Sequence, residues 1–222
     1  MINNKIKKIP FLRENNVKKL ILLISTASVL FLSGIVNAAP LTLISQADNW
    51  DYNFGASLGA GGGDNTYATF VAGYTGTNSG NGPFGNSNVP GAPYNILWSA
   101  NQALYLQKTV DLSGLNVNSA LLNLAVDNGA SVFVNGTKVF GASAGGFTNI
   151  WEYSQGINTS PFVNGINTIS VIGNDYGGLT YFDMELTADV SRVVSTPEPS
   201  SLIILGLGMI GLFVLTRRRV IA

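Results

Sequence analysis

The sequence predicts an all-β fold for residues 39–195, in the form of a single antiparallel, jelly-roll-like β-sandwich. Three observations support this prediction. The stretch of 157 residues holds 22 Gly and 19 Asn, both of which favour turns. Short runs rich in Val, Ile, Tyr and Phe recur between the Gly and Asn clusters. No segment keeps the apolar period of 3.6 residues that an amphipathic helix requires, so strands are favoured throughout.

The strongest local prediction is a β-hairpin made by residues 130–134 and 137–140. Asn135-Gly136 joins them, and this dipeptide supplies the two positive-φ residues of a type I′ turn. Further strands are expected at 103–110, 120–127, 167–173 and 179–187. Residues 55–91 are Gly- and Asn-rich and predict long loops, with one strand around 67–74.

Charge and composition exclude several classes of function. The chain has no Cys and no His, which excludes thiol nucleophiles, Ser-His-Asp relays, Cys/His zinc sites and disulfides. The net charge of zero conceals segments of different sign, because residues 39–195 carry 3 basic and 10 acidic side chains. An acidic body repels phosphate, so nucleic acid is not an expected partner.

Residues 1–38 have the organisation of a secretory signal peptide. A basic region precedes an uncharged run from Leu20 to Val36, and Val36-Asn37-Ala38 follows. Small residues at these positions fit signal peptidase, so we expect cleavage between Ala38 and Ala39. The alternative is an uncleaved anchor helix, since the run almost spans a bilayer core. Both alternatives export the rest of the chain.

Residues 196–222 contain a second apolar run, from Leu202 to Thr216. It predicts a short transmembrane helix at about residues 200–216. Basic side chains follow it, namely Arg217, Arg218 and Arg219, and they place this end in the cytoplasm. That orientation agrees with an exported body.

Pro197-Glu198-Pro199, a short Gly-rich apolar helix and a terminal Arg cluster together resemble the PEP-CTERM sorting signal of Gram-negative bacteria. The resemblance implies that an inner-membrane enzyme, exosortase, recognises the Pro-Glu-Pro motif and removes the helix. The body would then leave the inner membrane for the cell surface or its exopolysaccharide matrix. The alternative is a Pro-containing linker ahead of a permanent tail anchor.

Three stretches of the body, residues 103–112, 120–136 and 165–171, resemble the galactose-binding-like β-sandwich. The similarity lies in an aromatic strand with a basic residue, an Asp-Asn-Gly turn at 127–129, a hairpin closed by Asn135-Gly136 and a strand after Gly165-Ile166-Asn167. It implies the fold and no particular ligand.

Candidate ligand-binding residues come from aromatic and amide chemistry. Aromatic faces stack on sugar rings while Asn and Asp bond to hydroxyls, which suits carbohydrate binding. Trp151 and Tyr153 follow a Gly-rich loop and are candidates for ligand contact, with packing over the sandwich end as the alternative. Asp127 and Asn128 are candidates for an ion or ligand site, although a turn cap is the favoured interpretation.

Calcium is a possible cofactor, because its preferred ligands are carboxylate and amide oxygens. Asp48, Asp51 and Asp64 lie near Asn residues, but their spacing fits no known calcium loop and surface turns are favoured. No catalytic residues are assigned. The sequence therefore predicts an exported, non-catalytic protein of the surface or matrix that binds carbohydrate or associates with extracellular polysaccharide. A carboxylate-dependent glycan-active enzyme and a purely structural matrix protein remain alternatives.

Overall fold

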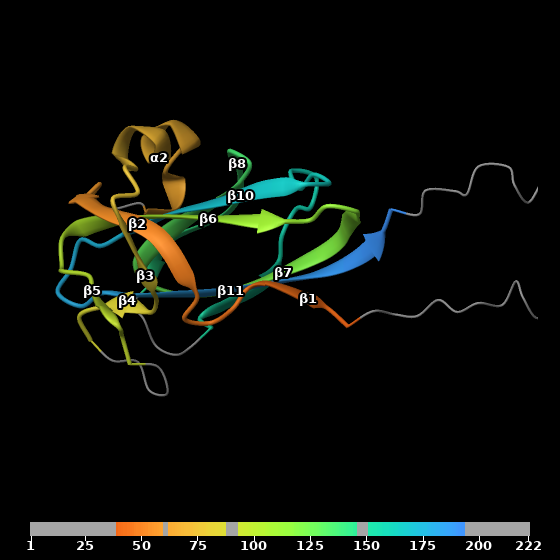
Figure 1. The fold of residues 1–222 in the computed structure, drawn as a ribbon. Coiled ribbons are helices and arrows are strands. Elements are labelled where there is room, and N and C mark those ends of the chain that lie inside the picture. The colour runs from red at the N-terminus through yellow and green to blue at the C-terminus, as the bar shows by residue number, and fades with distance from the viewer. Residues whose placement is uncertain (1–38, 60–61, 88–92, 146–150, 194–222) are drawn as a thin grey trace, which may run out of the picture. The chain divides into compact units, whose positions relative to one another are not determined.

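The computed structural model describes residues 39–59, 62–87, 93–145 and 151–193 (Figure 1). Strands make up most of this body, so the all-β prediction is confirmed. The strands are β1 Leu41–Ile44, β2 Asn49–Ala56, β3 Asn78–Asn81, β4 Phe84–Gly85, β5 Ile96–Leu97, β6 Gln102–Asp111, β7 Leu115–Val134, β8 Thr137–Gly145, β9 Tyr153–Gly156, β10 Ile166–Asn174 and β11 Tyr181–Arg192. A 3₁₀ turn, η1 Gly62–Asp64, and a helix, α2 Tyr67–Gly73, complete the described elements.

The strands lie in two layers that share β7. One layer has the order β3-β2-β6-β10 and continues into the second part of β7, which also pairs with β8. The other contains β11, the first part of β7, and the short strands β1, β4, β5 and β9 (Figure 1). Because β7 belongs to both layers, the strands form one continuous and nearly closed sheet rather than two separate ones.

The passage of β7 between the layers occurs at Asp127-Asn128-Gly129. Up to Asp127 the strand pairs with β11, and from Gly129 it pairs with β10. The turn predicted here is therefore wrong, since these residues stay within a paired strand. The strand passes from one layer to the other at this point.

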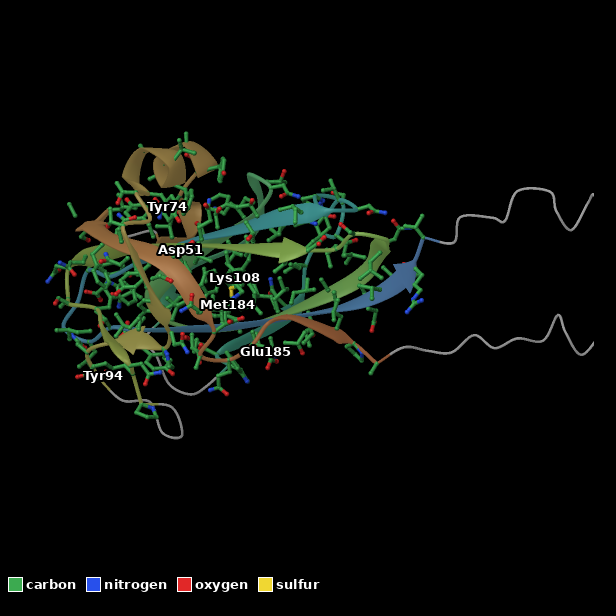
Figure 2. The ribbon with its side chains drawn as sticks, in the orientation of Figure 1. Asp51, Tyr74, Tyr94, Lys108, Met184 and Glu185 are labelled. Atoms are coloured by element: carbon green, nitrogen blue, oxygen red, sulfur yellow. The ribbon has the colours of Figure 1, made fainter. Side chains whose placement is uncertain are left out.

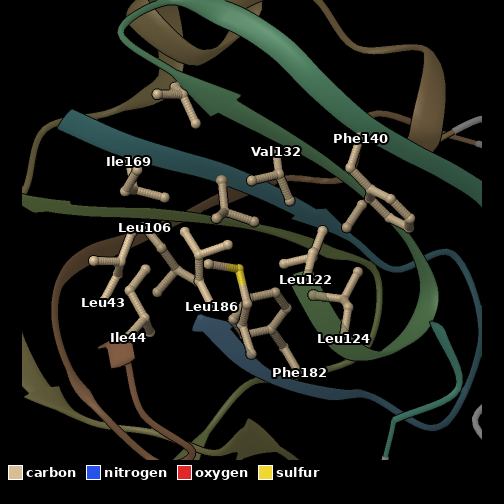
Figure 3. Close-up of a cluster of buried hydrophobic side chains, with 14 of the residues drawn as sticks. Leu43, Ile44, Leu106, Leu122, Leu124, Val132, Phe140, Ile169, Phe182 and Leu186 are labelled. Carbon is tan, nitrogen blue, oxygen red and sulfur yellow. The ribbon is translucent and has the colours of Figure 1, made fainter. Parts of the chain in front are cut away.

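The core lies between the two layers. Figure 3 shows Leu106, Val132 and Ile169 from one layer facing Leu122 and Phe182 from the other. All five are at most 1% exposed. The inward positions alternate along each strand, as the period of two in a β-strand requires. This apolar core gives the body its stability without disulfides, since the chain has no Cys.

Helix α2 covers the outer face of the first layer (Figure 1) and replaces the strand expected at 67–74. Thr66 caps the helix by accepting a hydrogen bond from the Thr69 N–H at 3.3 Å. Tyr67, Phe70 and Tyr74 share one helical face and pack with a second apolar cluster that includes Tyr105. The prediction was wrong because β-favouring residue types outweighed the three-and-four spacing of these aromatic side chains.

The predicted hairpin at Asn135-Gly136 is confirmed. It joins β7 to β8, and the two turn residues have φ of 48° and 81°. The strands expected at 103–110, 167–173 and 179–187 correspond to β6, β10 and β11.

The predictions for the chain ends fall outside the described residues, apart from Ala39, which is exposed just before β1. These are the signal peptide up to Ala38, the sorting residues Pro197, Glu198 and Pro199, the helix at 200–216 and Arg217–Arg219. Within the part of the chain that the structure describes, no helix is long and apolar enough to cross a membrane.

Candidate functional site

The crossing of β7 brings Asp127 and Asn128 to one end of the body, beside the loop between β10 and β11. Asp127 lies opposite Tyr181, the first residue of β11. Gly129 lies opposite Asn174, the last residue of β10. Two of the four predicted ligand candidates are thus placed at a junction of loops, where binding residues commonly occur. We call this region the acidic end.

Hydrogen bonds hold the β10–β11 loop in place. The carboxylate of Asp175 accepts bonds from the Asn101 N–H at 2.5 Å and from the Gly177 N–H at 3.2 Å. The Tyr176 N–H donates to Oδ1 of Asn128 at 3.0 Å. Asn128 therefore connects β7 to the loop, while the Tyr176 side chain stays exposed.

Glycines allow the backbone segments at this end to approach closely. A Cβ on Gly129 would lie 2.6 Å from the Ala142 carbonyl oxygen, and one on Gly62 would lie 2.9 Å from the Gly129 carbonyl carbon. Neither distance leaves room for a side chain. The absence of side chains at Gly62 and Gly129 therefore allows η1 to pack directly against β7, at the point where β7 passes between the layers.

Asp127 has the most unusual environment of the candidate residues. Its side chain is buried, with 5% exposed, and Oδ1 has no hydrogen-bond partner among the described residues. Burial, followed by the charges of Asp175 and Glu152, raises the pKa of Asp127 to about 6. An ionised carboxylate held without a donor is energetically costly, and a ligand that donates hydrogen bonds or carries positive charge would relieve that cost.

Trp151 and Tyr153 lie on either side of Glu152, whose charge acts on Asp127. Burial raises the pKa of Glu152, and its Oε2 is buried with no hydrogen-bond partner in the described ranges. Tyr153 packs its ring edge-on against Phe140 at 5.4 Å between centroids, so packing explains much of its position. Trp151 is half-exposed and has a positive φ of 60°.

Asp48, the first of the three calcium candidates, has a basic partner. Lys108, labelled in Figure 2, donates to Oδ1 of Asp48 at 2.9 Å and to the Asn49 carbonyl oxygen at 3.0 Å. Burial acts to raise the pKa of Asp48, but the bonds from Lys108, Ser45 and Asn49 lower it overall. Across residues 39–59, 62–87, 93–145 and 151–193, no group of three or more Asp or Glu is arranged to hold a metal ion. Calcium at either location would need backbone or ligand oxygens as additional partners.

Sequence reasoning found Asp127 and Asn128 but missed Glu152, Asp175 and Tyr176 as their neighbours. Glu152 lies between the two aromatic candidates and was not itself singled out. Asp175 lies in a polar loop that matches no known motif. The run Asn174-Asp175-Tyr176-Gly177-Gly178 directly after a strand was the available signal, because polar and Gly-rich loops at strand ends often carry function.

Comparison with solved structures gave distant similarities. The chain resembles the PA14 domain of the MpAFP antifreeze protein at 13% identity and a TM-score of 0.36, covering 74% of this chain and 90% of that one. It also resembles a PA14 sugar-binding domain from an RTX adhesin, at 15% identity and a TM-score of 0.35, covering 65% and 90%. A Faecalibacterium prausnitzii beta-glucuronidase matches at 14% identity and a TM-score of 0.37, over 71% of this chain and 33% of the enzyme.

Comparison with curated protein sequences found no match. The sequence model of the PEP-CTERM protein-sorting motif matches residues 195–219, which begin two residues beyond the last described one. This match confirms the resemblance seen in Pro197-Glu198-Pro199 and the terminal Arg cluster. A motif of this kind marks an exported protein whose membrane-anchored precursor is processed by an exosortase. The chain is therefore an exported protein that carries a PEP-CTERM sorting motif at residues 195–219.

Proposed function

We propose that the exported body is a non-catalytic carbohydrate-binding module that associates with extracellular polysaccharide through its acidic end. The observation that supports this most is the buried Oδ1 of Asp127, which has no hydrogen-bond donor among the described residues. The proposed final location is the cell surface or its matrix, after release from the inner membrane.

Sugar hydroxyls suit the chemistry of this end. A carboxylate accepts hydrogen bonds but donates none, and a sugar offers several neighbouring hydroxyl donors. Asp127 and Glu152 each present a buried oxygen that lacks a partner in the described chain. Satisfying such oxygens gives a ligand both affinity and orientation.

Aromatic residues with exposed surface are adjacent in sequence to two of the acidic residues. Tyr176 stands in the β10–β11 loop next to Asp175, and half-exposed Trp151 is adjacent in sequence to Glu152. A ring face beside hydroxyl-binding oxygens is a common arrangement for sugars. The charge argues against an acidic ligand, since residues 39–195 carry 10 acidic and 3 basic side chains. The proposed ligand is a neutral oligosaccharide.

A glycan-active enzyme is the second candidate, and one observation favours it. Glycoside hydrolysis uses a pair of carboxyl groups, one of which has a raised pKa. The pKa of Asp127 is raised to about 6 and that of Glu152 is also raised, both chiefly by burial. Hydrolysis of a bound glycan would therefore separate this candidate from simple binding.

A glycan array tests the proposal with three forms of the body, comprising residues 39–195. They are the unchanged protein, Asp127→Asn and the control Asp111→Asn, whose carboxylate is exposed and bonded to Ser113. We expect neutral oligosaccharides to bind the unchanged protein and the control, and Asp127→Asn to lose about tenfold or more in affinity. Each array is run with calcium and with a chelator, to measure any dependence on calcium.

Other outcomes of the array point elsewhere. Equal binding by all three forms would place the site away from Asp127. Release of reducing ends from bound glycans would support the enzyme, and no binding to any glycan would support a structural matrix protein. Far-ultraviolet circular dichroism on each variant checks that it is folded.

A further inference from the structure

Both chain ends of the body lie at the end opposite Asp127. Strand β1, which starts two residues after Ala39, pairs antiparallel with the later half of β11, with Leu41 opposite Ala188. Beyond β11, the Val193 N–H donates to the Gly114 carbonyl oxygen at 2.8 Å. In Figure 1, β11 runs from the left to an arrowhead at the right, on the side where β1 begins. We call this region the tether end.

The length of β11 separates the two ends of the body. Asp127 is paired with Tyr181 at the start of this strand, and Leu115 is paired with Arg192 at its last residue. Eleven steps at about 3.3 Å each give a separation of roughly 35 Å along the strand. The acidic end and the tether end are therefore too far apart to contact one surface together.

The sorting segment holds the tether end near the bilayer in the precursor. The apolar run starts at Leu202, nine residues after Val193. Nine residues reach at most about 30 Å when fully extended. No equivalent restraint acts on the acidic end.

Apolar side chains are gathered at the tether end. Val163, Ile166 and Val193 are exposed by 53%, 62% and 46%. Their segments meet near Gly114, whose N–H donates to Oδ1 of Asn164 at 2.9 Å and whose carbonyl oxygen accepts from Val193. Ile166 pairs with Asp111, three residues before Gly114. Exposed branched side chains gathered in this way favour contact with an apolar or interfacial surface.

We propose that the tether end rests on the outer surface of the inner membrane in the anchored precursor, with Val163, Ile166 and Val193 against the lipid. The acidic end then points away from the bilayer and is open to solutes before processing. Cleavage near the tether end and ligand binding at the acidic end are consequently independent events. This inference goes beyond the proposed function, because it holds for any ligand.

The absence of Cys makes a direct test possible, since one introduced thiol can be labelled selectively. Ser113→Cys carries a fluorophore at the tether end and Gly178→Cys carries one at the acidic end. Both positions are exposed, and a Cβ at Gly178 meets no atom within 4 Å. The protein, spanning residues 39–222, is reconstituted into phosphatidylethanolamine–phosphatidylglycerol vesicles that contain a headgroup-attached quencher.

We expect several-fold stronger quenching at position 113 than at position 178. Equal quenching, or stronger quenching at position 178, would overturn the proposal. A chain that stops at Ser195 should show little quenching at either position, since it lacks the anchor. Because no glycan is present, the outcome is independent of whether the acidic end binds sugar.

A second comparison tests the apolar contact itself. Val163→Ser combined with Ile166→Ser should reduce quenching at position 113, whereas Val71→Ser on α2, at a side chain that is 61% exposed, should not. Equal quenching in the two variants would contradict a lipid contact at Val163 and Ile166. Sedimentation of the tailless chain as a dimer that the Val163→Ser/Ile166→Ser change dissociates would assign this surface to a second copy and also overturn the proposal.

Discussion

The side chain of Asn135 in the β7–β8 turn donates a hydrogen bond to Oδ1 of Asn167 in β10 at 2.8 Å. Asn167 is fully buried and also bonds to the Val163 N–H, the Val163 carbonyl oxygen and the Gly165 carbonyl oxygen. The hairpin turn is thus connected through one amide to the loop that precedes β10. The conformation of this turn therefore affects the loop before β10 as well as the two strands that the turn joins.

Gly136→Val tests the turn. Gly136 has a φ of 81°, which a β-branched residue adopts only under strain, and a Cβ there would lie 3.1 Å from the Tyr67 ring. We expect the free energy of unfolding to fall by roughly 1 kcal/mol or more. Denaturant unfolding measures the change, with Thr137→Val in the neighbouring strand as the control. A loss no larger than that of the control would count against the strained turn.

The sequence predicted those parts of the fold that local chemistry determines. Asn135-Gly136 specified its own turn, and the runs rich in β-favouring residues between Gly and Asn clusters predicted β6 and β10. Helix α2 was missed because its seven residues are stabilised by packing against Tyr105 and Phe133, which lie far away in sequence.

The candidate site was only partly predictable for a related reason. Asp127 and Asn128 were visible as polar residues between apolar runs. Their neighbours Glu152 and Asp175 come from other segments, and the crossing of β7 between layers brings the segments together. Non-local pairing of this kind leaves no periodic signal in the sequence.

Gly129→Ala tests the close approach of backbones at the acidic end. The new Cβ would lie 2.6 Å from the Ala142 carbonyl oxygen, so β7 and β8 must separate locally. We expect a loss of about 1–3 kcal/mol in the free energy of unfolding, measured by urea denaturation. Gly178→Ala is the control, because its Cβ meets no atom within 4 Å. Similar stabilities for the two variants would contradict the described packing.

The stability of the body should decrease as the pH rises from about 4 to about 7. Burial raises the pKa of Asp183 to about 6, although the N–H groups of Ala47 and Met184 donate to it and act to lower the pKa. In the unfolded chain the same carboxyl titrates near its ordinary value of 3.8. The folded state therefore binds the proton more tightly, and this contribution to stability is complete below about pH 4 and is lost as the pH rises through 6. Asp127 acts in the same direction.

Asp183→Asn should remove much of this dependence. The amide keeps an oxygen that can accept the two N–H groups and carries no charge to bury. We expect the variant to be more stable than the unchanged body at pH 8 by roughly 2 kcal/mol, and to differ little from it at pH 4. Thermal melts at several pH values provide the measurement, with Asp189→Asn on the exposed part of β11 as the control. A parallel pH profile for the Asp183 variant and the unchanged body would contradict the assignment.

Glu198→Ala tests recognition of the sorting motif. The change leaves the apolar run and Arg217–Arg219 intact, so membrane insertion should be unaffected. We expect the variant to accumulate at full precursor length in the inner-membrane fraction, while the unchanged protein is released. Fractionation of the native host with immunoblotting measures this, and Ser201→Ala is the control. Identical release of the Glu198 variant and the unchanged protein would show that the tail acts only as an anchor.

Carbohydrate binding at Asp127 is tested most directly by titrating its carboxyl group with carbon-13 NMR, without and with the oligosaccharide that binds most tightly. In the free body the resonance should report a pKa of about 6. Hydroxyl groups that donate to the ionised form favour it, so a bound sugar should shift the resonance and lower this pKa. A resonance and a pKa that saturating oligosaccharide leaves unchanged would contradict carbohydrate binding at Asp127.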